Sequence, residues 1–154
     1  MKKPFDQSMY DADDPAKQQI LDWLISTQNF NGEINPDQYG IDIIGDFGGE
    51  PFAAEVEVKH NWVGEQFPFD TVHFSARKLK FLETPINACF MMLNHDRTHV
   101  LIVRKPYLQS AIIVTKDTIY TTYEQFIEVP LTCCSIEVLE SKQNDSRIER
   151  QLFH

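Results

Sequence analysis

The sequence contains no long run of apolar residues. Its longest uninterrupted apolar stretch, residues 88–93, has six members, whereas a membrane-spanning helix needs about 20. The basic residues Lys2 and Lys3 are followed by a mostly polar segment, residues 4–8, and not by the apolar stretch of a secretory signal peptide. These two absences lead us to expect a soluble, cytoplasmic protein with no membrane partner.

Cysteine is also scarce. The three cysteines are Cys89, Cys133 and Cys134. Their number is odd, two are adjacent, and they form no CxxC pair, so they fit neither a disulfide framework nor a cysteine zinc site. We expect reduced thiols that pack in the core.

Positive charge is outweighed by negative charge. The chain has 14 Lys and Arg against 23 Asp and Glu, which gives a net charge of -9. Taken alone, this charge argues against a nucleic-acid partner, because such proteins rely on Lys and Arg contacts to phosphate. Binding depends on where the cations lie, however, and four basic side chains gather within residues 73–80.

The chain does contain enough apolar material for one core. It is 42% hydrophobic and has 11 Phe, 5 Tyr and 2 Trp, which excludes global disorder. A length of 154 residues predicts one domain spanning residues 1–154. Within this domain, residues 1–13 are polar and expected to be mobile, and residues 141–154 are polar and poorly patterned.

A helix followed by a β-hairpin is predicted in the first 60 residues. Ile20, Leu21 and Leu24 repeat at helical spacing after the start signal Asp14-Pro15, which predicts a helix over residues 15–27. Alternation of polar and apolar residues, broken by Gly48-Gly49, predicts an antiparallel hairpin. After a loop over 29–38, the hairpin is expected to consist of a strand over 39–46, a turn over 47–50 and a second strand over 51–60.

The rest of the chain predicts a mixed α/β arrangement. We expect a loop over 61–71, a helix over 72–83, strands over 86–93, 99–104 and 107–114, and a short strand with a helical turn over 118–127. The sequence therefore predicts one α/β domain built around a mixed β-sheet.

The hairpin carries the residues that suggest chemistry. Glu57 and Lys59 are two apart on a strand and share a face, and pairing of the strands can place the Asp42 carboxylate beside that of Glu57. Two neighbouring carboxylates repel each other unless a cation lies between them. Oxygen ligands suit Mg²⁺ or Mn²⁺, and the backbone carbonyl of Val58 can add a ligand.

Lys59 would then orient or deprotonate the attacking water, or hold the phosphate. Glu55 lies on the same face of the strand. It is either a further acid of the site or a solvated residue.

The arrangement of Gly40-Ile41-Asp42 followed by Glu57-Val58-Lys59 resembles the PD-(D/E)XK nuclease superfamily. That superfamily includes type II restriction enzymes, Holliday-junction resolvases and phage exonucleases. The resemblance covers about residues 14–105. It implies a restriction-endonuclease-like αβββαβ core, with a mixed sheet flanked by helices, and divalent-metal-dependent hydrolysis of DNA, most simply by an endonuclease. The small size of the chain suggests a phage or bacterial source.

The resemblance also implies roles for residues outside the hairpin. Members of the superfamily often carry an acid on the first helix, for which Asp22 is our preferred candidate as a further metal ligand and Asp14 the alternative. The helix after the hairpin would bind DNA phosphates. Its candidate DNA-binding residues are His73, Arg77, Lys78 and Lys80. Many members dimerise to cut two strands, so the resemblance also allows a homodimer.

Two other interpretations remain open. The missing helical Glu and the net charge of -9 favour a catalytically weak or inactive nuclease-fold module that binds DNA or a protein. Alternatively, the chain is an unrelated α/β protein in which the motif arises by chance. The aromatic residues Trp62, Phe67 and Phe69 either stack on bases or cap the core.

Overall fold

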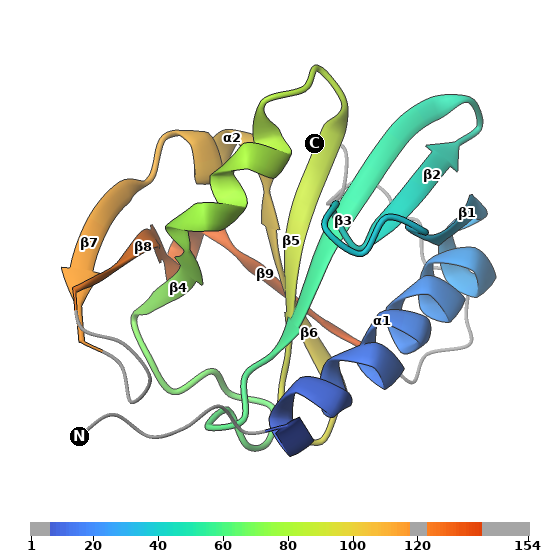
Figure 1. Ribbon diagram of the computed structural model, residues 1–154. Coiled ribbons are helices and arrows are strands. Elements are labelled where there is room, and N and C mark those ends of the chain that lie inside the picture. The colour runs from blue at the N-terminus through green and yellow to red at the C-terminus, as the bar shows by residue number, and fades with distance from the viewer. Residues whose placement is uncertain (1–6, 118–122, 140–154) are drawn as a thin grey trace.

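The structure is a computed structural model that describes residues 7–117 and 123–139. The described residues form two β-sheets and a few helical segments (Figure 1). The strands are β1 (Phe30–Ile34), β2 (Ile43–Phe47), β3 (Glu50–Val58), β4 (Thr71–Ser75), β5 (Asn87–Leu93), β6 (His99–Arg104), β7 (Ile112–Lys116), β8 (Glu124–Pro130) and β9 (Ser135–Val138). The helices are α1 (Gln7–Gln28) and α2 (Lys105–Gln109), with 3₁₀ turns η1 (Ala76–Leu82) and η2 (Leu131–Cys133).

The larger sheet is mixed, as predicted. Its six strands lie in the order β1-β2-β3-β5-β6-β9, in which β3 and β5 are parallel and the other pairs antiparallel. A parallel pair needs a crossover connection, and here the chain between β3 and β5 runs through β4 and η1. The α/β class and the mixed sheet are thus confirmed.

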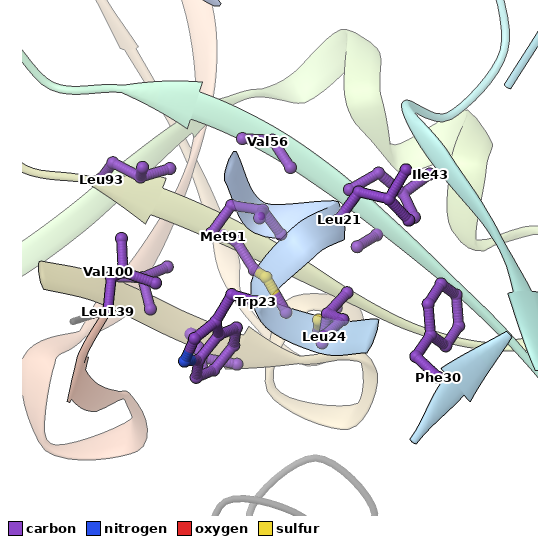
Figure 2. Packing of buried hydrophobic residues seen from close by; sticks show 14 of the residues in the cluster. Leu21, Trp23, Leu24, Phe30, Ile43, Val56, Met91, Leu93, Val100 and Leu139 are labelled. Carbon is purple, nitrogen blue, oxygen red and sulfur yellow. The ribbon is translucent and has the colours of Figure 1, made fainter. Parts of the chain in front are cut away.

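The large sheet lies between two different layers. Helix α1 packs on one face, where Leu21, Leu24 and Trp23 meet apolar side chains of the strands (Figure 2). The other face is covered by the small sheet β4-β8-β7, by η1 and by α2. Each layer buries its own apolar cluster against the central sheet.

Strand β3 contributes to both layers because its side chains alternate. Ala54 and Val56 belong to the cluster under α1, whereas Ala53 belongs to the cluster on the opposite face. Glu55 and Glu57 therefore point away from α1, toward the layer that contains η1. The predicted division of this strand into an acidic and an apolar face is confirmed.

The hairpin itself is also confirmed. Ile43 pairs with Ala54 and Phe47 with Glu50, in antiparallel register. Gly48 and Gly49 have φ values of 58° and 96°, which side-chain-bearing residues adopt at a cost. The turn can therefore be tight, and this tightness sets which residues of the two strands face each other.

The segment after the hairpin corrects the predicted helix over 72–83. Thr71–Ser75 is strand β4, in which Val72 and Phe74 are buried and alternate with His73, and only Ala76–Leu82 is helical, as the 3₁₀ turn η1. The pairing of β4 with β8 satisfies the backbone of the first half. The mixed periodicity of this segment reflects two short elements in succession.

Several element boundaries differ from the sequence-based predictions. Residues 7–13 belong to α1, which was expected to begin at Pro15. The expected loop over 29–38 contains β1, which pairs with β2. The expected strand over 107–114 is divided between α2, whose first turn contains Pro106, and β7. Residues 118–122 lie outside the described residues, and the residues expected to form a helical turn after them lie at the start of β8.

Two aromatic residues in the loop after β3 belong to the core. Trp62 is fully buried and Phe67 nearly so, with their rings 5.2 Å apart, edge to face. They cap the core and do not present a stacking surface, whereas Phe69 is 45% exposed. Cys89 is a buried free thiol, as expected. Within the described chain, no helix is both long enough and apolar enough to span a membrane.

Candidate functional site

Asp42 is attached to β3 by two hydrogen bonds just before β2 begins. Its backbone N–H donates to Oε1 of Glu55 at 3.2 Å, and its Oδ2 accepts from the backbone N–H of Val56 at 2.8 Å. The side chain thus extends the contact between the two strands beyond the last paired residues, Ile43 and Ala54. The hairpin holds Asp42 beside Glu55 rather than leaving it free in solvent.

Helix α1 contacts Asp42 through a lysine. The Nζ of Lys17 lies 3.1 Å from Oδ1 of Asp42 and 3.6 Å from Oδ1 of Asp14. Burial lowers the pKa of Lys17, but the carboxylates of Asp42 and Asp14 more than offset this effect, so its pKa lies above the ordinary value. The ammonium is held in its charged form at this end of the site.

The expected helical acid does not reach Asp42. Asp22 is exposed, and its Oδ1 accepts a hydrogen bond from Gln18 on the same helix at 2.9 Å. Asp14 is exposed as well and forms the ion pair with Lys17. The resemblance implies a negative residue on this helix, whereas the structure places the positive Lys17 beside Asp42.

A second lysine joins the two acids of β3. Lys78, on η1, places its Nζ 3.3 Å from Oε2 of Glu55 and 3.4 Å from Oε2 of Glu57. Burial lowers the pKa of Lys78, but Glu57 and Glu55 outweigh this and raise it above the ordinary value. Lys78 was expected to bind DNA, and its contact with both carboxylates was not foreseen.

Glu55 is the most perturbed acid of the site. It is 8% exposed, and burial raises its pKa to about 8, with Lys78 opposing the rise and Asp42 adding to it. Glu55 is therefore buried beside Asp42 and is not a solvated strand residue. Near neutral pH Glu55 keeps a proton that exposed acids would have lost.

Glu57 has one carboxylate oxygen in use and one without a partner. Its Oε2 contacts Lys78, whereas its Oε1 is buried and accepts no hydrogen bond within the described part of the chain. Leaving a buried polar atom unpaired is costly. A hard divalent cation is one group that would satisfy such an oxygen.

Carboxylate and backbone carbonyl oxygens are the donor types that Mg²⁺ and Mn²⁺ bind. At this site Asp42 and Glu57 carry carboxylate oxygens, and Val58, the last residue of β3, carries a backbone carbonyl next to Glu57. In residues 7–117 and 123–139, however, no three His, Cys, Asp or Glu side chains are spaced to hold a metal ion together. A bound ion would need Asp42 and Glu57 to be completed by backbone oxygen, water or substrate oxygen.

Lys59 lies at the end of β3, near Glu57. Its Nζ is 5.2 Å from the centre of the Phe69 ring. Burial lowers its pKa, Glu57 opposes the shift, and Lys116 of β7 adds to it. Lys59 therefore interacts electrostatically with Glu57, but the close ion pair of Glu57 is made by Lys78.

The other candidate DNA-binding residues are spread over the small sheet and η1. His73 contacts Glu128 at 3.3 Å and Lys116 at 2.7 Å. Arg77 is highly exposed and makes a 3.6 Å ion pair with Glu124. Lys80 is exposed on the same 3₁₀ turn. The cations thus lie on the layer that faces Glu55 and Glu57.

Arg77 also borders a hollow beside this layer. The cavity has a volume of about 440 Å³ and is lined by Ser75, Arg77, Tyr123 and Gln125, among others. A basic side chain at the rim of a hollow is consistent with an anionic ligand, although Glu124 lines it too.

Comparisons with models of known protein families and with curated proteins find no match to this chain.

The raised pKa of Glu55 predicts how stability depends on pH. Because the folded protein holds this proton more tightly than the unfolded chain does, the proton stabilises the folded state, and this stabilisation is fully present below about pH 4.5. It is lost as pH rises toward about 8, and over this range the free energy of unfolding falls by at most about 1.4 kcal/mol per pH unit. Glu55→Gln should flatten this slope in urea denaturation measured in chelator at pH 5–9.

The exposed Glu65 provides the control for this measurement. Glu65→Gln removes an acid without touching the buried pair, so its stability curve should follow that of the wild-type protein. An identical slope in Glu55→Gln and wild type would show that Glu55 is not the group responsible.

Proposed function

We propose that this protein is a divalent-metal-dependent nuclease that hydrolyses phosphodiester bonds in DNA. The observation that carries the proposal is the unpartnered, buried Oε1 of Glu57 in a cluster that also holds Asp42, Glu55 and two lysines. An acid cluster of this kind, beside Lys59, supports the resemblance to the PD-(D/E)XK nuclease superfamily.

The element order supports the same family. Helix α1 is followed by β1, β2 and β3, and the chain then crosses over to β5, which is parallel to β3. The resembling αβββαβ core has a helix in that crossover. Here the crossover contains β4 and the 3₁₀ turn η1, which is a departure from the family pattern.

In the proposed reaction Asp42 and Glu57 would hold a Mg²⁺ or Mn²⁺ ion together with the carbonyl of Val58. When bound, such an ion makes a nucleophile of water at neutral pH and stabilises charge on the phosphate oxygens. Lys59 orients the attacking water or accepts its proton, and Arg77 with His73 helps to hold the phosphate backbone.

A second candidate function is a nuclease-like module that binds nucleic acid or protein without cutting. Two features favour it: Lys17 and Lys78 already neutralise the acids, and no three acids in the described residues are spaced for a metal ion. In this alternative the lysines and carboxylates form a purely structural network.

A cleavage and binding assay tests these two functions. Linear duplex, branched and single-stranded DNA are incubated with the protein in Mg²⁺ or Mn²⁺, and binding is measured in parallel at several salt concentrations. Metal-dependent cleavage that chelator stops supports the nuclease. Binding without cleavage of any substrate supports the module, and neither binding nor cleavage contradicts both proposals for nucleic acid.

A further inference from the structure

Lys78 occupies the position between the two acids of β3. Its Nζ is 3.3 Å from Glu55 and 3.4 Å from Glu57, and its side chain is only 20% exposed. It comes from η1, a turn anchored by the buried Leu82. The contacts therefore join two layers of the fold and are not a chance meeting of surface side chains.

A divalent cation on Glu57 would meet this ammonium at close range. The carboxylate of Glu57 already gives Oε2 to Lys78, and only Oε1 is without a partner. Two positive charges bound to one carboxylate repel each other, and the repulsion is strong in a partly buried site. The lysine and the metal ion therefore cannot both bind Glu57 at full strength.

The Lys78 ammonium is expected to stay in the site after it loses its contact with Glu57. The flexible four-carbon stem of the lysine can turn about η1, and a largely buried ammonium that loses one of its two carboxylate partners favours contact with another anion. The phosphate of a nucleic acid is the anion that the proposed reaction brings to this position. Glu55 remains as the second anchor of the amine.

We propose that Lys78 and a divalent cation compete for Glu57, and that the Lys78 ammonium displaced by the cation contacts the phosphate of the substrate. The phosphate contact of Lys78 rests on the proposed nuclease function. The competition for Glu57 does not, because it involves only the protein and the ion.

The first test measures metal binding without nucleic acid. Titration calorimetry with Mn²⁺ and with Mg²⁺ compares wild type with Lys78→Met, which removes the competing charge and should bind the ion about tenfold more tightly. Lys78→Arg keeps the charge and should not gain affinity. Lys80→Met removes a charge from the exposed side of the same turn and should change the affinity little.

The second test measures cleavage at saturating metal. Lys78→Met should lower kcat about 100-fold, the usual loss when a charge that stabilises the transition state is removed. Lys78→Arg should restore part of it. Tighter metal binding together with slower cleavage is the expected signature, because a residue that merely supports the fold would weaken both.

Each outcome decides a separate part of the proposal. Equal or weaker metal binding in Lys78→Met, or no metal binding in wild type, overturns the competition, and unchanged kcat overturns the phosphate contact. A wild type that binds the ion but cuts no substrate contradicts the nuclease function while calorimetry still decides the competition. If circular dichroism shows that Lys78→Met is unfolded, Lys78→Gln, which can still donate to Glu57, takes its place.

Discussion

Glu57→Ala is expected to abolish the rise in melting temperature that Mg²⁺ or Mn²⁺ produces in the wild-type protein. An ion that binds only the folded state stabilises it by about 2.7 kcal/mol at one hundred times its dissociation constant. For a domain of this size that is a rise of about 5–10 °C. Glu57 supplies the only oxygen found buried without a hydrogen bond among the described carboxylates, so its loss removes the centre of the proposed site.

The control for this prediction is on the same strand. Glu50 lies at the exposed start of β3 and pairs in register with Phe47 at the hairpin turn, away from Lys78. Glu50→Ala should keep the full thermal shift. Scanning calorimetry of both variants, with and without the ion, provides the comparison. An equal shift in Glu57→Ala and wild type would place the metal elsewhere in the protein.

Lys59→Ala is expected to lose DNA cleavage by about 100-fold or more while it keeps its fold and much of its affinity for DNA. A lysine that acts on the attacking water contributes mainly in the transition state, and loss of a positioned acid or base costs about 10²–10⁴ in rate. Single-turnover cleavage with enzyme in excess separates this loss from weaker binding.

Arg77→Ala provides the contrasting case. Its guanidinium is highly exposed and pairs with Glu124 rather than with an acid of β3, so its loss should weaken DNA binding and lower the salt dependence by about 0.9 per phosphate contact in duplex DNA. The rate at saturating enzyme should change little. If Lys59→Ala behaved like Arg77→Ala, Lys59 would be a phosphate contact and not a residue of the reaction.

The hairpin could be predicted from sequence because its signals are local. Alternation along β3 separates Glu55 and Glu57 from Ala54 and Val56, and the glycines Gly48 and Gly49 mark the turn. Strand periodicity of two and the conformational freedom of glycine act within a few residues. The approach of Asp42 to β3 follows from this pairing, although its partner there is Glu55.

The segment after the hairpin could not be read in the same way. The alternation of buried Val72 and Phe74 with polar residues lasts only the five residues of β4 before η1 begins. Neither the strand period nor the helix period therefore continues long enough to dominate the pattern. What makes residues 71–75 a strand is their pairing with β8, more than fifty positions later in the chain. Local propensity is weak compared with such long-range pairing.

The α/β class, the β2–β3 hairpin and the shared face of Glu55 and Glu57 follow from the amino-acid pattern alone, because each depends on short-range periodicity and turn chemistry. The identity of the cations that meet these acids depends instead on how the layers of the fold pack together. Lys17 reaches Asp42 because α1 packs against the sheet, and Lys78 reaches Glu57 because the crossover from β3 to β5 folds η1 over the other face. Such contacts depend on how layers pack, and no spacing within one element encodes them.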